Sequence, residues 1–384
     1  MTPKGPCESA VYDMSQPPIY VTRPYLPPLE EVMPYLEGIW ERKILTNNGP
    51  LHQELEKNLK DYFGVPGVSL MNNGTSALIG PLLTLPKHSH VVTSPFTFAA
   101  TTHSIEMLDL QPVFADIDPL YYGLTPEAVE AAITPETSAI LAVHTYGTPC
   151  DVDGLAEVAK KHNLVLIYDA SHAFGVKYNG RSLLSYGDMA TLSFHATKSF
   201  NTFEGGAVVS STTEMETQIN MIKNFGIRGE NEIPLVGFNG KMSELNAAVG
   251  LVQLEHFEKV RSMRKEVHDW YMQELSGLNY VNICPQMEGV ESNFSYFPIL
   301  ISEDAPKNRD QVFDAMSEMG VMSRRYFSPI MSDLEMYRSL PSADPENLPV
   351  ARDIGARVLC LPIYPGLVEE DRVRVLEALT ASMQ

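Results

Sequence analysis

The chain has 384 residues, of which 44% are hydrophobic, and a formal net charge of −20 at pH 7. This length exceeds one ordinary hydrophobic core, so we expect more than one domain in a globular protein. The acidic balance argues against nucleic-acid binding, which needs a basic face, and against long-range attraction of anionic ligands. The four cysteines have neither metal-binding nor disulfide-type spacing, which indicates reduced thiols in a cytoplasmic protein: Cys7, Cys150, Cys284 and Cys360.

The amino-terminal 28 residues are rich in proline and have no apolar core of the signal-peptide type. No apolar run in the sequence is long enough to cross a bilayer, so we expect no membrane association. A long stretch with few helix breakers, residues 243–275, is expected to link two domains. We therefore predict an arm over residues 1–28, a large domain over 29–250 and a small carboxyl-terminal domain over 251–384.

Between about residues 51 and 211, short apolar segments alternate with amphipathic ones. This alternation predicts strands at 68–71, 90–93, 113–115, 139–143 and 164–168, and helices at 75–85, 99–108, 126–133 and 152–162. Strands that alternate with helices indicate a parallel sheet covered on both faces. Ligands of such sheets bind beyond the carboxyl ends of the strands, so the functional site is expected there.

Two further segments, 189–194 and 206–210, are predicted as the final strands, forming a hairpin-like return at one end of the sheet. The loop between them carries Lys198. In the small domain the pattern predicts strands at 294–301, 322–326 and 358–361, and helices at 311–319 and 369–382.

The strongest functional signal is Lys198 together with Asp169. Asp169 follows a strongly apolar strand, where an unpaired carboxylate would be costly, and Lys198 lies on a loop with hydroxyl groups and glycines. This arrangement is the one needed to hold pyridoxal 5'-phosphate: the lysine forms the Schiff base and the acid pairs with the protonated ring nitrogen. When an amino donor displaces Lys198, the freed amine becomes the general acid and base for proton transfer. A surface lysine and a turn-capping aspartate are the alternatives that fit this setting less well.

The cofactor phosphate needs backbone N–H groups at a helix amino terminus, and Gly74, Thr75 and Ser76 lie between a predicted strand and helix. Ser193 is expected to add a hydroxyl donor. Taken alone, this segment would be a turn and a helix cap; next to the lysine loop it favours phosphate binding.

Two ring side chains are candidates for contact with the cofactor ring. Phe98 follows a strand end and is predicted to stack on the pyridine, although a phenylalanine near a strand end is usually part of the core. His172 lies three residues after Asp169. A contact with the ring or its phenolic oxygen and a hydrogen-bonded core histidine are equally compatible with that position.

Ordered motifs across the chain, from about Arg23 to the carboxyl terminus, resemble the DegT/DnrJ/EryC1/StrS family of sugar aminotransferases. The matching segments are Gly49-Pro50 after Thr46 and Asn47, Gly74-Thr75-Ser76, Thr97-Phe98, Asp169-Ala-Ser-His172, Ser193-Phe-His-Ala-Thr-Lys198, Glu204-Gly-Gly206 and Asn239-Gly-Lys-Met-Ser-Glu-Leu-Asn-Ala-Ala248. The resemblance implies an α/β fold of the aspartate-aminotransferase type (fold type I), with a mostly parallel seven-stranded sheet and a smaller carboxyl-terminal α/β domain.

The resemblance also implies pyridoxal 5'-phosphate as cofactor, L-glutamate as amino donor and a nucleotide sugar as acceptor. It further implies a homodimer with shared active sites, in which Asn239 reaches the cofactor phosphate of the partner subunit. Residues 323–329, Ser-Arg-Arg-Tyr-Phe-Ser-Pro, depart from the His-Tyr found before the proline in many members, and 224–228, Asn-Phe-Gly-Ile-Arg, depart from the commoner Asn-His-Gly.

The Arg-Arg-Tyr-Phe form resembles the viosamine-forming subgroup, which aminates C4 of a nucleotide-linked 4-keto-6-deoxyhexose. A 3-keto-sugar aminotransferase of the same family is the alternative, and the nucleotide, dTDP or UDP, stays open. The residues predicted to contact the substrate are Thr46, Asn47, Arg228, Arg325 and Tyr326. Lys241 and Arg324 are weaker candidates that fit ordinary surface charges as well.

Two other functions compete with this interpretation. Sugar dehydratases of the family use pyridoxamine phosphate and typically have histidine where this chain has Lys198, which argues against a dehydratase. A non-catalytic, cofactor-binding regulator is the second alternative. No segment resembles a DNA-binding appendage, and the net charge disfavours one.

Overall fold

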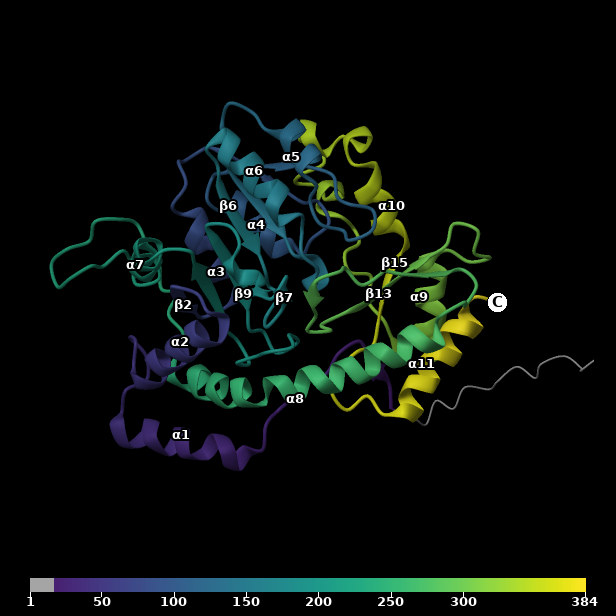
Figure 1. The fold of residues 1–384 in the computed structure, drawn as a ribbon, viewed down its shortest axis with the longest axis horizontal. Coiled ribbons are helices and arrows are strands. Elements are labelled where there is room, and N and C mark those ends of the chain that lie inside the picture. The colour runs from purple at the N-terminus through teal and green to yellow at the C-terminus, as the bar shows by residue number, and fades with distance from the viewer. Residues whose placement is uncertain (1–16) are drawn as a thin grey trace, which may run out of the picture.

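The computed structural model describes residues 17–384, and a seven-stranded sheet lies at its centre (Figure 1). The strand order is β2-β10-β9-β6-β5-β3-β4. The strands are β2 (Gly67–Met71), β3 (His90–Thr93), β4 (Gln111–Phe114), β5 (Thr137–Val143), β6 (Val165–Asp169), β9 (Met189–Ser193) and β10 (Gly206–Ser210). All neighbours from β9 to β4 are parallel, and only β10 runs antiparallel, to β9 and to β2. The predicted mostly parallel seven-stranded α/β sheet is therefore confirmed.

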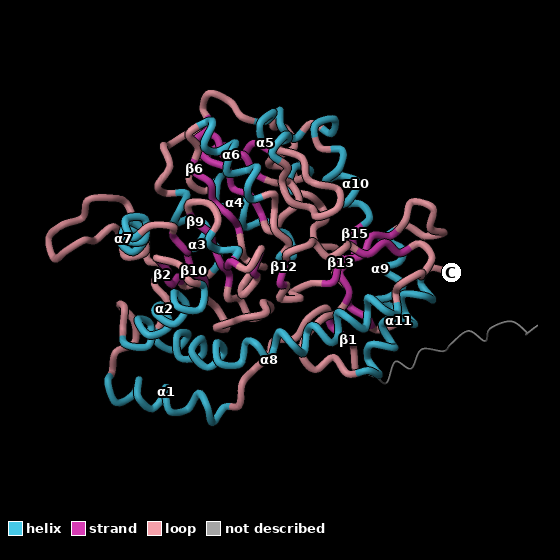
Figure 2. The backbone as a smooth tube through the Cα atoms, viewed as in Figure 1, coloured by secondary structure: helices cyan, strands magenta, loops and turns pink. Residues whose placement is uncertain are grey.

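Helices cover both faces of this sheet, as Figure 2 shows, because alternate residues of each strand point to opposite faces. In β5, Ile140 and Ala142 belong to one hydrophobic core, whereas Ala139 and Leu141 belong to the other. One face packs against α3 (Gly74–Leu82), α4 (Ala99–Glu106) and α7 (Thr213–Ile222). The opposite face packs against α2 (Pro50–Phe63), α5 (Pro126–Ala132), α6 (Val152–His162) and the first part of α8 (Glu244–Glu274).

Helix α8 continues beyond the large sheet and contributes Val267 and Tyr271 to a separate core. That core joins the antiparallel sheet β11-β13-β15 to two helices. The elements are β11 (Val281–Ile283), β13 (Phe297–Ile301), β15 (Val358–Leu361), α9 (Arg309–Glu318) and α11 (Glu369–Ser382). α10 (Pro349–Arg357) leads into β15, and a small sheet has the order β12 (Val290–Glu291), β7 (Lys177–Tyr178) and β8 (Arg181–Ser182).

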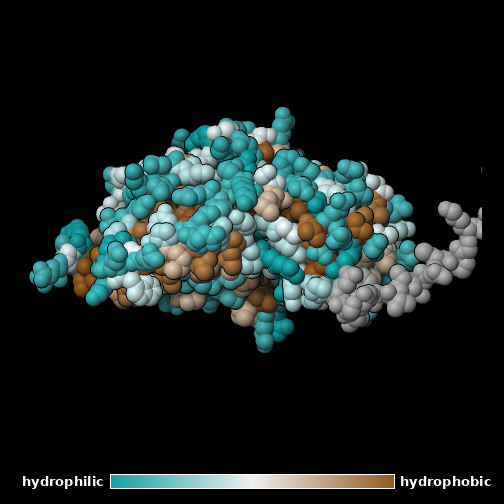
Figure 3. All heavy atoms as spheres, turned by 90° about the horizontal axis from the view of Figure 1, so that it is seen from below, coloured by the Kyte–Doolittle hydropathy of each residue, from teal (hydrophilic) through white to brown (hydrophobic). Residues whose placement is uncertain are grey.

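Helix α1 (Leu29–Arg42) packs along α8 through Val32, Val249 and Val252. Figure 3 views the molecule from the side on which these two helices lie, and hydrophobic residues are exposed there among hydrophilic ones. On α1, Leu29 is 67% exposed and Trp40 is 73% exposed. No helix within residues 17–384 is both long enough and apolar enough to span a bilayer.

Two predicted strand arrangements differ from the fold. The β9–β10 pair does not end the sheet, because β10 is buried at every position and also pairs with β2, which forms the edge. The predicted strand over 322–326 is confined to β14 (Val321–Met322), which pairs with β1 (Ile19–Tyr20). Beyond it, Arg324 makes only an isolated bridge to Cys360, because the chain turns so that the rings of Tyr326 and Phe327 pack beside Tyr296 and Tyr146.

The predicted amino-terminal arm is only partly described, since residues 1–16, including Cys7, lie outside the described residues. Its described part is tied to the carboxyl-terminal region: β1 pairs in parallel with β14, and the main-chain N–H of Ile19 donates to the carbonyl of Gly320 at 2.9 Å. Helix α3 ends at Leu82 rather than at residue 85.

Candidate active site

Lys198 lies on the loop that joins β9 to β10, beyond the carboxyl end of β9. Backbone hydrogen bonds close the loop, from Phe194 N–H to the Gly205 carbonyl at 2.8 Å and from Thr202 N–H to the Phe194 carbonyl at 2.9 Å. The fully buried rings of Phe194 and Phe200 anchor it in the core. The loop thus presents Lys198 at the edge of the sheet where the predicted site was expected.

The strands that flank the Lys198 loop, β9 and β10, pass close to the segment predicted to bind the phosphate, Asn73-Gly74. At both contacts only a glycine fits. A Cβ atom at Gly206 would lie 2.6 Å from the Asn73 carbonyl oxygen, and one at Gly74 would lie 2.7 Å from the Ser193 Cβ. Side chains at either position would push the two loops apart. Ser193, Gly74 and Lys198 are therefore brought to one place, as predicted.

Asp169 ends β6, the strand next to β9, and pairs with Thr191 across the sheet. Its side chain is only 5% exposed. The Oδ2 atom accepts a hydrogen bond from the Thr101 hydroxyl at 2.7 Å, and Oδ1 accepts one from the Ser171 N–H at 3.1 Å. Within residues 17–384 no cation is bonded to this carboxylate. Buried carboxylates normally have such a partner, so a protonated ring nitrogen fits the donor set.

Lys198, Asp169 and His172 line one cavity of about 290 Å³, together with Tyr296 and Tyr326. Burial lowers the pKa of Lys198 to about 8, although the charges of Asp169 and Tyr326 act in the opposite direction. The Lys198 ammonium group donates a hydrogen bond to the Tyr296 hydroxyl at 3.2 Å. The lowered pKa increases the unprotonated share of this amine near neutral pH, and the unprotonated form is the one that acts as a nucleophile or base.

His172 is a hydrogen-bonded, buried histidine that also lines the cavity. Its Nδ1 atom accepts a hydrogen bond from the Tyr146 N–H at 3.1 Å, so the ring proton lies on Nε2. Burial and the charge of Lys198 hold the pKa of His172 well below its usual value, and the ring is neutral. The ring also lines the cavity and lies 4.7 Å from the Tyr296 ring.

The segment predicted to bind the phosphate, Gly74-Thr75-Ser76, forms the start of a helix. α3 begins at Gly74, and the Asn73 side chain caps it by accepting a hydrogen bond from the Ser76 N–H at 2.8 Å. That amide is therefore occupied. The N–H groups of Gly74 and Thr75 have no hydrogen-bond acceptor within the described chain. Both residues line the cavity, so these groups could donate to a phosphate bound there.

Other predicted residues lie at the rim of the cavity or outside it. Phe98 lines the cavity but is 59% exposed, so its ring is not packed in the core. Asn239 is exposed away from the cavity, and its carbonyl accepts a hydrogen bond from the Asn72 side chain at 3.3 Å. Of the five predicted substrate residues only Tyr326 lines the cavity.

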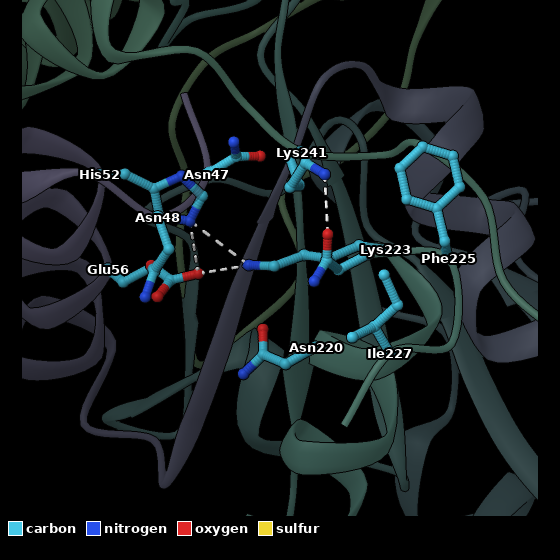
Figure 4. Close-up of a pocket in the computed structure, with 10 residues that line it drawn as sticks. Asn47, Asn48, His52, Glu56, Asn220, Lys223, Phe225, Ile227 and Lys241 are labelled. Atoms are coloured by element: carbon cyan, nitrogen blue, oxygen red, sulfur yellow. Dashed lines mark hydrogen bonds and ion pairs between the residues drawn. The ribbon is translucent and has the colours of Figure 1, made fainter. Parts of the chain in front are cut away.

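The remaining substrate candidates are dispersed. Arg325 pairs with Asp310 at 2.7 Å and lies over the Phe313 ring, and Arg228 pairs with Glu232. Thr46 and Arg324 are exposed. Asn47 and Lys241 line a second cavity of about 560 Å³, shown in Figure 4. This cavity is the larger one, but Asp169 and Lys198 do not line it, so its size does not make it the reactive site.

The two side chains that bond to the Asp169 and Lys198 side chains, those of Thr101 and Tyr296, were not predicted. Thr101 lies on α4, with its hydroxyl also 2.8 Å from that of Thr97, and fixes the Asp169 carboxylate. Tyr296 precedes β13 and reaches Lys198 from 98 positions further along the chain. No local spacing relates either residue to the lysine or the acid, and only the fold brings them together.

Comparison with known proteins agrees with this geometry. The family model of the DegT/DnrJ/EryC1/StrS aminotransferase family matches residues 29–380. The chain belongs to this family. The resemblance inferred from the sequence motifs is thus confirmed, and the protein is an aminotransferase of the DegT/DnrJ/EryC1/StrS type with the predicted fold.

Individual relatives of this aminotransferase are similar along nearly their whole length. A dTDP-4-amino-4,6-dideoxy-D-glucose transaminase from Shigella dysenteriae is 46% identical over 368 residues, which cover 96% of this chain and 98% of the relative. The solved structure of DesI in the presence of its TDP-sugar product has a TM-score of 0.91 at 36% identity, covering 96% and 94% of the two chains. The PLP-form of Spr1654 from Streptococcus pneumoniae, a putative sugar aminotransferase, has a TM-score of 0.88 at 25% identity, covering 95% and 98%.

Proposed function

We propose that this aminotransferase transfers the amino group of L-glutamate to C4 of a nucleotide-linked 4-keto-6-deoxy-D-glucose, with pyridoxal 5'-phosphate as cofactor. The product is a nucleotide-linked 4-amino-4,6-dideoxy sugar. The observation that carries the proposal is Lys198, a lysine whose pKa is lowered to about 8. It shares one cavity with the buried Asp169 carboxylate, which has no cationic partner among residues 17–384.

The residues of the cavity fit the cofactor group by group. Asp169 would hold the ring nitrogen, and Lys198 would hold the aldehyde carbon. The free amides of Gly74 and Thr75 and the Ser193 hydroxyl would hold the phosphate. When bound, the cofactor supplies an electron sink that acidifies the α-carbon of the amino donor.

The protein residues supply orientation and proton transfer. Lys198, once freed by the donor amine, takes the proton from the donor α-carbon at its Nζ atom and later returns a proton from the same atom. Thr101 keeps the Asp169 carboxylate in place through its 2.7 Å hydrogen bond. The neutral His172, held by the Tyr146 N–H, presents an Nε2 donor without adding a charge to the cavity.

The charge balance of the cavity supports a homodimer. Its lining side chains include one lysine, Lys198, and two carboxylates, Asp169 and Glu204, whereas the cofactor phosphate, glutamate and a nucleotide diphosphate are all anions. Further cations must therefore come from outside this lining. Arg228 lies on an exposed segment with Ile233 and Val236, which are 67% and 78% exposed, as expected for a surface that a second copy covers.

The sugar in the proposal rests on the relatives and on residues 323–329, which follow β14. The Shigella relative is named for dTDP-4-amino-4,6-dideoxy-D-glucose, and the DesI structure was solved with a TDP-sugar. We therefore favour dTDP over UDP as the nucleotide. Tyr326, from the Arg-Arg-Tyr-Phe segment that suggested C4 amination, lines the cavity beside Tyr296.

The test is an assay of the purified protein, loaded with pyridoxal 5'-phosphate, with glutamate and a panel of dTDP- and UDP-linked 4-keto and 3-keto sugars. We expect 2-oxoglutarate and an amino sugar with dTDP-4-keto-6-deoxy-D-glucose, and NMR of the product should place the nitrogen on C4. Amination of the 3-keto sugars alone would contradict the proposed position. Absence of any glutamate-dependent product would contradict the proposed reaction.

A further inference from the structure

Tyr296 is the hydrogen-bond partner of the reactive lysine. The Lys198 Nζ atom lies 3.2 Å from the Tyr296 hydroxyl oxygen and 5.7 Å from the centre of its ring. Within residues 17–384 this is the one hydrogen bond that the Lys198 side chain makes. Neither carboxylate that lines the cavity, Asp169 or Glu204, is paired with it. The partner of this amine is thus a neutral hydroxyl group rather than an acid.

The chain just before Tyr296 is fixed by a buried asparagine. Asn293 is fully buried, and its amide nitrogen donates to the carbonyls of His172 and Phe174 at 2.8 and 2.9 Å. Its amide oxygen accepts hydrogen bonds from the Ser295 N–H at 3.1 Å and from the Ser295 hydroxyl at 2.8 Å. A buried amide whose donors and acceptor are all used holds the segments it joins in one arrangement.

Ser295 adds two more attachments. Its hydroxyl lies 3.2 Å from that of Ser199, the neighbour of Lys198. Its carbonyl accepts a hydrogen bond at 3.3 Å from Arg264 of α8, which also donates to the Ile363 carbonyl at 3.1 Å. Arg264 is 1% exposed and forms no ion pair within the described chain. Tyr296 is therefore held by the lysine loop, by the segment after β6 and by α8.

A phenol suits an amine that changes its protonation state. A hydroxyl group accepts a hydrogen bond from an ammonium group and donates one to a neutral amine, whereas a carboxylate only accepts and would favour the ammonium form. Burial raises the pKa of Tyr296, so the phenol keeps its proton at neutral pH. Because Lys198 has a pKa of about 8, both forms of the amine occur under ordinary conditions and both can bond to Tyr296.

From this geometry we propose that Tyr296 is a catalytic residue of the transamination: its hydroxyl holds the Lys198 amine while that amine is free, donating to it before proton uptake and accepting from it afterwards. This proposal rests on the proposed function. The proton that Lys198 takes from the donor α-carbon leaves again from the same nitrogen. Tyr296 retains its own proton throughout and only rotates its O–H bond.

The first test is Tyr296→Phe, which keeps the ring contacts with His172 and removes only the hydroxyl. The half-reaction of the loaded enzyme with glutamate, followed by stopped-flow absorbance, should slow by about 10- to 100-fold, because positioned proton transfer contributes on this scale. The apparent dissociation constant of glutamate should stay within about twofold. The primary isotope effect with α-deuterated glutamate should rise, since proton transfer becomes more rate-limiting.

The matched control is Tyr271→Phe. This residue also has a buried hydroxyl, which donates to the Pro362 carbonyl at 2.9 Å, but it does not line the cavity. Loss of this hydroxyl should lower the free energy of unfolding slightly and leave the rate of the glutamate half-reaction unchanged. A purely structural role of Tyr296 would make the two variants alike, with equal isotope effects.

A second readout needs no cofactor. In cofactor-free protein, the pH dependence of Lys198 carbamylation by cyanate, measured by peptide mass spectrometry, reports the pKa of this amine. Hydrogen bonds to charged groups are stronger than those to neutral ones, so losing the hydroxyl destabilises the ammonium form more. The midpoint should fall by about half to one pH unit in Tyr296→Phe and stay unchanged in Tyr271→Phe.

The outcomes separate this proposal from the proposed function. If wild-type protein reacts with glutamate and Tyr296→Phe reacts at the same rate with the same carbamylation profile, the role of Tyr296 is overturned and the reaction stands. If wild-type protein loaded with the cofactor gives no reaction with glutamate, the proposed function fails and the catalytic role of Tyr296 fails with it.

Discussion

Two lysines in this protein, the half-buried Lys198 and the buried Lys223, have opposite surroundings. Lys198 donates to a phenol, whereas the Lys223 amine, in the cavity of Figure 4, lies 2.7 Å from a carboxylate oxygen of Glu56. The same Glu56 oxygen lies 3.0 Å from His52 Nε2 and accepts a hydrogen bond from the Leu70 N–H at 2.9 Å. The second lysine thus joins α2, β2 and the end of α7, and every partner it has is structural.

The electrostatic consequences differ accordingly. Burial lowers the pKa of both lysines, but at Lys223 the charge and hydrogen bond of Glu56 oppose this effect directly. Burial alone would raise the pKa of Glu56, but the hydrogen bond of His52 and the charge of Lys223 outweigh it and bring this pKa to about 2. A buried lysine with a bonded carboxylate stays an ammonium ion, and one left with a hydroxyl group remains available as a nucleophile and base.

The largest expected effect is that of Lys198→Ala. Removing the amine should lower turnover by at least about 10³-fold, because both the nucleophile and the proton-transfer group are lost. Cofactor should still bind through its phosphate and ring nitrogen, which absorbance after gel filtration would detect. Turnover at the wild-type rate would eliminate the role assigned to Lys198.

The next effect is expected for Asp169→Asn, which keeps the shape of the side chain and an acceptor for the Thr101 hydroxyl. A neutral amide cannot stabilise a protonated ring nitrogen, so the glutamate half-reaction should slow by about 10²-fold. Rapid-mixing absorbance measures this rate, and an unchanged rate would show that Asp169 only caps the strand.

Glu56→Gln tests the structural lysine. It leaves the ammonium group of Lys223 buried without a counter-charge, so the free energy of unfolding should fall by roughly 3 kcal/mol. The pKa of Glu56 is lowered to about 2 from a usual 4.5, so its contribution is complete above about pH 4.5 and is lost as the pH falls toward 2. Urea unfolding between pH 7 and pH 3 should show a flatter pH dependence for the variant. Equal free energies of unfolding for the wild type and the variant would contradict a stabilising role of the Glu56–Lys223 pair.

The smallest effect is expected for Lys265→Ala, the control for Glu56→Gln. Lys265 is 57% exposed and pairs with Asp269 one turn along α8. Exposed pairs of this kind contribute about 0.3–0.5 kcal/mol, so the urea midpoint should hardly move. A loss as large as that of Glu56→Gln would remove the distinction between buried and surface pairs.

The sequence predicts the large sheet well because its strands are buried on both faces and appear as short apolar runs between helices. Asp169 and Lys198 are predictable for the same reason, since both follow strands whose carboxyl ends meet at one edge. The predictions fail where pairing depends on distant segments. β2 takes the sheet edge next to β10, and the chain after Met322 leaves its short strand so that aromatic rings pack at the cavity.

The site was predictable only for residues within local motifs. Thr101 and Tyr296 lie 68 and 98 positions from their partners Asp169 and Lys198, and no periodicity marks them. The predicted cations Arg228 and Arg325 have carboxylate partners outside the cavity in this single chain. A contact of either residue with the substrate therefore stays a prediction, and it would need a second copy or a bound ligand, which neither residue spacing nor one folded chain supplies.

The central claim is that Lys198, and not Lys223, reacts with the cofactor. The most direct measurement is borohydride reduction of the cofactor-loaded protein followed by peptide mapping by mass spectrometry. The account predicts a single phosphopyridoxyl group on Lys198, with the peptide that contains Lys223 unmodified. A label on Lys223 or on no lysine at all would contradict it.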